Sequence, residues 1–195
     1  MTKSLLISIR PQHLLNILNG DKTYEVRKVV PKWVLDKLDR GETVEAYLYC
    51  TKGKPYLINK DMLSEYYELR NVYTQNFTYE ILNGTIPVKV VIDGYDEVLT
   101  QHHIDGEQID RVLKYACIER EDFDKYIGDK EMAYALHISK LEILDEPKTL
   151  MQFYEPNIDV QCGLNGDIKD EEYVRCLEER RLTKAPQNCM SVWVK

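Results

Sequence analysis

The stretch GDKTYEVR at residues 20–27 places unlike charges at short, fixed spacing inside an otherwise apolar pattern. Side chains of a strand alternate between two faces, so Glu25 and Arg27 share one face of the strand predicted here. Lys22 stands at the mouth of this strand, and we expect Lys22 and Arg27 to be partly exposed. A carboxylate held beside two cations therefore predicts a polar pocket at this corner of the fold.

A short helix is predicted directly before this stretch, over residues 11–19. Pro11 suits the first helical position, and apolar residues recur after it at helical spacing. Gly20 stands where a left-handed cap would end the helix. His13 is expected to be an exposed residue of this helix.

The rest of the chain predicts short strands and helices in irregular order. Because they do not alternate strictly, a doubly wound parallel sheet is disfavoured. We expect a single α+β domain over residues 1–195, built on a small, mostly antiparallel β-barrel with short helices around it. Strands are expected at 5–10, 24–29, 43–50, 87–98, 133–144 and 189–194, and helices at 31–38, 60–69, 105–115, 119–127, 147–153 and 170–181.

Charge is distributed unevenly along the chain. Residues 1–60 hold 11 Lys and Arg against six Asp and Glu, a net charge of +5, whereas the whole chain carries −7 and the remainder therefore −12. The acidic total argues against coating of a long nucleic acid. A basic third on an acidic body favours a local anionic ligand, although an uneven surface without function has the same pattern.

Composition points to a reducing, aqueous compartment. The five cysteines are scattered without a C-x-x-C pair, so neither a disulfide framework nor a zinc site is expected. No apolar stretch is long enough for a membrane span, and the apolar part of the N-terminus is too short for a signal peptide. We expect a cytoplasmic protein with no metal and no cofactor.

The spacing G-x-K-x-x-E-x-R, made by Gly20, Lys22, Glu25 and Arg27, resembles the signature of the ASCH domain, a family of the PUA-like superfold. Residues 7–11 resemble the entry to the first helix in small phage and bacterial members. Later segments that resemble the family are 123–126, 133–138, 145–150 and 185–188. Residues 51–86 and 155–183 look like insertions in a shorter core.

The resemblance implies a β-barrel with a groove that binds RNA or a nucleotide-like ligand. One branch of the family removes the acetyl group from a modified cytidine with a lysine, a threonine and a glutamate. Lys22 occupies the lysine position here, whereas Glu25 stands at the threonine position, which argues against that activity because a carboxylate is a different nucleophile. Other members are described as ribonucleases, a reaction that the sequence neither supports nor excludes.

Three functions therefore remain open. The first is an RNA- or nucleotide-binding module, the second a hydrolase of a modified nucleoside or RNA with Lys22 and Glu25 as catalytic groups, and the third a phage-type domain that binds a host protein. Tyrosines on strands and a histidine in mid-strand are candidates for base stacking, with core packing as the structural alternative. The expected ligand-binding residues are Arg10, Lys22, Glu25, Arg27, Lys28, Tyr47, Tyr49 and His137.

Overall fold

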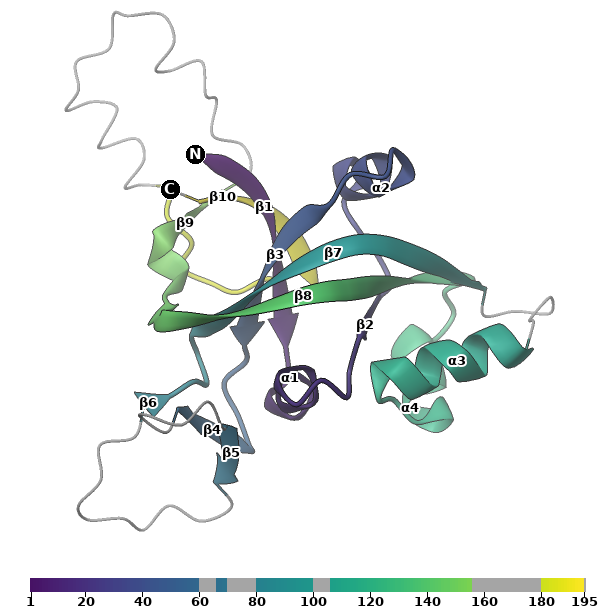
Figure 1. Cartoon of the computed structure of the whole chain (residues 1–195), viewed down its shortest axis with the longest axis horizontal. Helices are drawn as coiled ribbons and strands as arrows, with labels where there is room; N and C mark the ends of the chain where they lie inside the picture. Colours follow the sequence, from purple (N-terminus) through teal and green to yellow (C-terminus); the bar gives the residue numbers. More distant parts are fainter. Residues whose placement is uncertain (60–65, 70–79, 100–105, 156–179, 195) are drawn as a thin grey trace, which may run out of the picture.

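A strongly curved, seven-stranded sheet dominates the computed structural model, which describes residues 1–59, 66–69, 80–99, 106–155 and 180–194 (Figure 1). The strand order is β2-β8-β7-β3-β1-β10-β9, and all neighbours are antiparallel except β1 and β3. The α+β class and the mostly antiparallel sheet are therefore confirmed. The strands are β1 (Thr2–Ile9), β2 (Tyr24–Arg27), β3 (Val44–Cys50), β7 (Ile86–Leu99), β8 (Met132–Lys148), β9 (Phe153–Tyr154) and β10 (Cys189–Val194).

Two helices cover one face of this sheet and form the largest core. Alternate residues of β3 point into it, among them Ala46 and Leu48, and α1 and α2 contribute Leu14 and Val34. All four side chains are fully buried, as their apolar character requires. The two helices are α1 (Pro11–Leu18) and α2 (Lys32–Asp39).

Two further helices pack near the β2–β8 end of the sheet, at the right of Figure 1. Their apolar side chains, such as Val112 and Phe123, meet Val26 of β2 and Ala135 of β8. The helices are α3 (Gly106–Ala116) and α4 (Arg120–Ile127), close to their predicted bounds.

Other side chains form a third core. It joins Tyr47 and Tyr49 of β3 to Phe153 of β9 and to Leu182. Tyr47 meets Phe153 edge to face, with the ring centroids 5.0 Å apart. The strand predicted at 43–50 is thus confirmed, and its side chains alternate, because both tyrosines belong to a different core from Ala46 and Leu48.

A second, three-stranded sheet has the order β5-β4-β6 and lies within the predicted insertion 51–86. Its strands are β4 (Tyr56–Asn59), β5 (Tyr66–Leu69) and β6 (Glu80–Ile81). The predicted helix 60–69 is therefore wrong for residues 66–69, which pair with β4, and its other residues lie outside the described ones. Aromatic residues such as Tyr66 and Tyr67 favour strands, and Asn59, the expected N-cap of that helix, belongs to β4.

Other expectations also change. Among the described residues the large sheet has two free ends, β2 and β9, so it is a curved open sheet rather than a closed barrel. Residues 147–153 are not an α-helix, because β8 extends to Lys148 and only a single 3₁₀ turn, η1 (Leu150–Gln152), follows. Most of the predicted helix 170–181 lies outside the described residues, as does most of the predicted insertion 155–183.

Candidate functional site

The candidate site lies at the corner between α1 and β2. The chain leaves α1 through Gly20, whose φ of +79° is the left-handed cap predicted for this position. Backbone N–H groups of Asp21 and Lys22 both donate to the carbonyl oxygen of Asn16, at 2.9 and 3.0 Å. This tight corner fixes Lys22 directly before β2, so its side chain turns toward the charged residues of that strand.

Lys22, Glu25 and Arg27 form one buried charge cluster. Arg27 Nη2 lies 2.7 Å from Glu25 Oε1, and Lys22 Nζ lies 3.2 Å from Glu25 Oε2. All three side chains are at least nine-tenths buried. The shared face of Glu25 and Arg27 is as predicted, but the expectation that Lys22 and Arg27 are partly exposed is wrong.

Burial of Lys22 depends on a residue far away in the sequence. Its ammonium group donates to the carbonyl oxygen of Ala116, at the end of α3, over 2.7 Å. The Thr23 N–H donates to the neighbouring carbonyl of Tyr115 at 2.9 Å. The C-terminal end of α3 thus packs against the corner between α1 and β2 and buries Lys22. The sequence around residues 20–27 does not predict this contact.

Arg27 is held by residues from β1 and from the segment just before β10. Its Nη2 donates to the Ser8 carbonyl oxygen at 2.6 Å, and its Nη1 to Asn188 Oδ1 at 3.2 Å. Asn188 in turn donates to the Val29 carbonyl at 3.0 Å, and the Ser8 hydroxyl to that of Pro186 at 2.6 Å. The planar guanidinium is therefore fixed in one orientation.

Two polar atoms of this cluster remain available. Arg27 Nε is buried and donates to no described residue, and Glu25 Oε2 makes its ion contact with Lys22 but accepts no hydrogen bond of good geometry from one. Buried polar groups are almost always paired in folded proteins, so each exception calls for an explanation. The unused hydrogen-bonding capacity of the cluster is therefore concentrated where the Glu25 and Arg27 side chains meet.

His13 joins this cluster, although the sequence predicts it to be exposed. Its side chain is half-buried, and Nδ1 has no hydrogen-bond partner among the described residues. Burial, together with the nearby charges of Lys22, Arg10 and Arg27, lowers the pKa of His13, and Glu25 opposes this shift. His13 is therefore neutral near pH 7. The sequence did contain a sign of this burial: His13 lies four residues before Ile17, which is buried, and residues at this spacing share one face of a helix.

The electrostatics of the cluster favour an ionised carboxylate. Burial alone would raise the pKa of Glu25, but Lys22 and Arg27 outweigh it and hold the pKa below its ordinary value. Two cations against one carboxylate leave an excess of positive charge. Cys189 lies at the edge of the cluster, where burial raises its pKa to about 11, so its thiol is not activated.

Two further expected ligand residues flank the cluster. Arg10 is exposed and directly precedes α1, where it contributes to the positive field on His13. Lys28 follows β2, is partly exposed and stands over the ring of Tyr126, with Nζ 4.8 Å from the ring centroid. Arg10 therefore offers a positive charge to solvent near the cluster.

The aromatic candidates lie elsewhere. Tyr47 and Tyr49 are buried in the third core, so the structure does not bring them to the charge cluster. His137 pairs in register with Tyr24 on β2, and its Nδ1 lies 2.6 Å from Asp93 Oδ1. Glu25 pairs with Leu136, the neighbour of His137 in β8. His137 is therefore on the opposite face of the sheet from Glu25.

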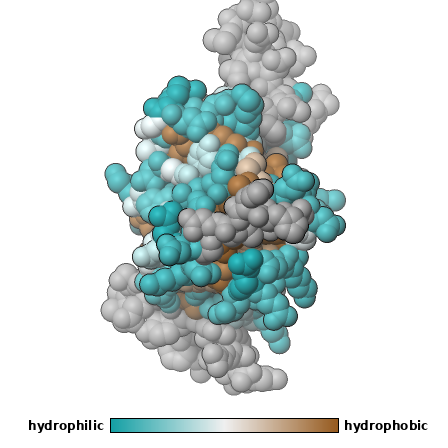
Figure 2. Space-filling model, turned by 90° about the vertical axis from the view of Figure 1, so that its right-hand side faces the viewer, coloured by the Kyte–Doolittle hydropathy of each residue, from teal (hydrophilic) through white to brown (hydrophobic). Residues whose placement is uncertain are grey.

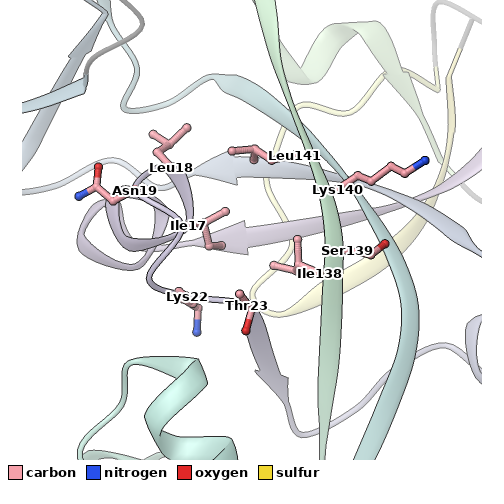
Figure 3. A pocket seen from close by; sticks show the side chains of 10 residues that line it. Ile17, Leu18, Asn19, Lys22, Thr23, Ile138, Ser139, Lys140 and Leu141 are labelled. Atoms are coloured by element: carbon pink, nitrogen blue, oxygen red, sulfur yellow. The ribbon is translucent and has the colours of Figure 1, made fainter.

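An open pocket of about 250 Å³ lies on the other side of the corner (Figure 3). Its apolar part comes from α1 and β8, and the nitrogen of Lys22 points away from it toward α3. The described lining contains no acidic side chain. The lining residues are Ile17, Leu18, Asn19, Gly20, Lys22, Thr23, Ile138, Ser139, Lys140 and Leu141.

The described part of the chain contains neither a cluster of metal ligands nor a membrane-spanning helix. No group of three or more His, Cys, Asp or Glu side chains there is arranged to hold a metal ion. None of the helices in those same ranges is both long and apolar enough to cross a membrane. On the face shown in Figure 2, hydrophilic side chains surround smaller hydrophobic areas.

Comparisons with known proteins identify the fold. No family model matches the sequence, and no curated protein matches it significantly. Solved structures of the ASCH protein of Zymomonas mobilis do match. A single-substitution variant superposes with a TM-score of 0.53 at 14% identity, covering 98% of this chain and 88% of that one. The ASCH protein itself gives 0.50 at 12% identity, covering 98% and 87%. The chain described here therefore has the same fold as the ASCH protein of Zymomonas mobilis.

Proposed function

We propose that this chain is an ASCH-type module that binds RNA or a nucleotide-like ligand at the Lys22–Glu25–Arg27 cluster. One observation carries the proposal: within side chains that are nine-tenths buried, the donor Arg27 Nε has no hydrogen-bond partner among the described residues, and the neighbouring Glu25 Oε2 is contacted only by the Lys22 ammonium, at 3.2 Å. A buried polar network left partly unpaired is costly to stability. A ligand that supplies the missing partners explains why such a network is present.

The charges indicate the chemistry of the ligand. The excess positive charge of the cluster and the exposed Arg10 favour an anionic group, such as one phosphate. The buried Arg27 Nε donor beside the Glu25 carboxylate favours the edge of a planar, polar ring. A nucleotide combines both features, and single-stranded RNA presents its base edges to proteins in this way.

Binding of single-stranded RNA tests the proposal. The affinity of a fluorescent oligonucleotide is measured by anisotropy over a salt series, for the unmodified chain and for Arg10→Gln. Because few phosphates are contacted, we expect a shallow decrease in affinity with salt. Arg10→Gln weakens binding, whereas the matched control Lys32→Gln, at an exposed cation of α2, does not. A salt slope of zero, or equal effects of both variants, contradicts phosphate recognition at this site.

A hydrolase is the second candidate, because an ionised Glu25 carboxylate lies 3.2 Å from Lys22 in a buried setting. Yet Lys22 is engaged by Glu25 and by the Ala116 carbonyl, and an amide hydrolase needs an activated nucleophile. We therefore expect little or no release of acetate from acetylcytidine, measured by chromatography of the nucleoside. Robust turnover that is lost in Lys22→Met would make this chain an enzyme.

Binding to a host protein is the third candidate. In that case the chain shows no affinity for RNA or for free nucleotides in the anisotropy assay. That outcome counts against the nucleotide proposal and for a protein partner.

A further inference from the structure

We propose that the outer edge of β8 over residues 139–143 is a self-association surface, at which two copies of this chain pair their β8 strands antiparallel about a two-fold axis. The surface is separate from the charge cluster. It combines an unpaired strand edge, exposed apolar side chains and the open pocket next to α1.

The unpaired edge follows from the lengths of the strands. On one side, β8 pairs with β7 from Met132 to Lys148. On the other, β2 covers it only up to His137, and the Ile138 N–H still donates to the Thr23 carbonyl oxygen at 2.8 Å. Figure 1 shows β2 meeting only the first part of β8. Beyond this point no described strand pairs with the outer edge, and a free edge is a template for another strand.

Exposed apolar side chains mark the same part of β8. Leu141 and Ile143 are 38% and 40% exposed. They pair with Val90 and Val88, both buried in the largest core, so they lie at the exposed margin of that core. Leu141 also lines the pocket between α1 and β8. Apolar residues at alternate positions beside a free edge are suited to an added strand.

Charge complementarity identifies the second strand as another copy. If two β8 strands pair antiparallel with Leu141 opposite Leu141, then Lys140 of each copy faces Glu142 of the other. Ser139 then faces Ile143 of the other copy. Both charges project from the opposite face to Leu141, and Glu142 is 58% exposed. Opposite charges directly across an antiparallel pair are stabilising.

The pocket fits this pairing. Residues directly opposite one another in an antiparallel pair project to the same face of the sheet. Leu141 lines the pocket, and Ile143 lies on the same face of its strand as Leu141, so Ile143 of the second copy lies on the pocket face beside the pocket. The bulge at Ser139, between the pairs Ile92–Ile138 and Val91–Lys140, ends the register there, so five residues of each copy take part.

Sedimentation of the full chain over a concentration series tests the association. The unmodified chain is expected to show a reversible monomer–dimer equilibrium. Leu141→Asp places a charge at the centre of the interface and abolishes the dimer. Leu99→Asp, at a leucine of β7 that is 47% exposed and away from this edge, leaves it unchanged. A monomer at every concentration, or a dimer that survives Leu141→Asp, overturns the proposal.

Charge reversal tests the register. Lys140→Glu and Glu142→Lys each create two like-charged pairs, so we expect each variant to dimerise about tenfold more weakly, or about 1.4 kcal/mol. An equimolar mixture of the two variants restores both opposite-charge pairs in the mixed dimer and regains the original affinity. Circular dichroism confirms that each variant is folded, which matters for Glu142→Lys because Glu142 also contacts Lys89 at 2.8 Å. Failure of the mixture to recover overturns the proposed register.

Discussion

Two sets of ion pairs in this chain use the same residue types with opposite consequences. Glu25 is enclosed between Lys22 and Arg27, and none of the three side chains is more than 8% exposed. Lys32 and Asp36 on α2 pair at 3.1 Å, but their side chains are 87% and 43% exposed. Water screens the pair on α2, whereas the buried cluster must satisfy its charges internally. The comparison shows that charge spacing alone does not reveal which pairs are structurally important.

The largest expected effect comes from removing the central carboxylate. Glu25→Ala leaves two buried cations without a counter-charge, and breaking a buried pair in this way costs about 3 to 5 kcal/mol. Urea unfolding followed by circular dichroism measures the loss in the free energy of unfolding. A loss as small as that of an exposed pair would show that water reaches the cluster.

A smaller effect is expected when the charge of Arg27 is kept but its shape is changed. Arg27→Lys retains a cation beside Glu25 but cannot reach both the Ser8 carbonyl and Asn188. Loss of a hydrogen bond to a charged group costs about 1.5 to 3 kcal/mol in the free energy of unfolding. The same unfolding assay measures it, and Asn188→Ala serves as the partner variant. If the two changes are coupled, the double variant loses less than the sum of the single ones.

The pH dependence of the free energy of unfolding distinguishes the contribution of His13 from that of Glu25. Both folded-state pKa values are lowered, so the unfolded chain binds more protons and stability falls as pH decreases. The contribution of His13 is lost from about pH 6.5 downward, and that of Glu25 from about 4.5 downward. In thermal unfolding across pH, His13→Gln removes the first decline and retains the second. His137→Gln, at a partly exposed histidine, serves as the control, and an unchanged first decline in His13→Gln contradicts this assignment.

The smallest effect belongs to α2. Asp36→Asn removes a solvent-exposed pair at helical spacing, for which about 0.3 to 0.5 kcal/mol is typical. Urea unfolding should therefore barely distinguish this variant from the unmodified chain. A loss comparable to that of Glu25→Ala would invalidate the contrast between the two regions.

The sequence predicts local features of the site better than its surroundings. Alternation in residues 20–27 correctly placed Glu25 and Arg27 on one face, because side-chain direction in a strand depends only on spacing. Their burial could not be predicted, since it depends on Ser8, Ala116 and Asn188, which only the folded sheet brings to this corner.

The misassigned elements have a related cause. The helix 60–69 was predicted with Asn59 as its N-cap, whereas Asn59 ends β4 and cross-strand pairing makes residues 66–69 a strand. The expected barrel remains an open sheet among the described residues, because closure depends on which edge strands meet and not on the local pattern. The exposure predicted for His13 was wrong because His13 lies four residues before the buried Ile17 and so on the same face of α1.

The most direct test of the central claim is to map the binding site by NMR. Backbone amide shifts of the isotope-labelled chain are followed while single-stranded RNA is added. We expect the amides around His13, those of Lys22–Arg27 and that of Asn188 to shift together with one saturation curve. Shifts confined to other surfaces, or no shifts at all at saturating RNA, would contradict the assignment of the buried charge cluster as the ligand site.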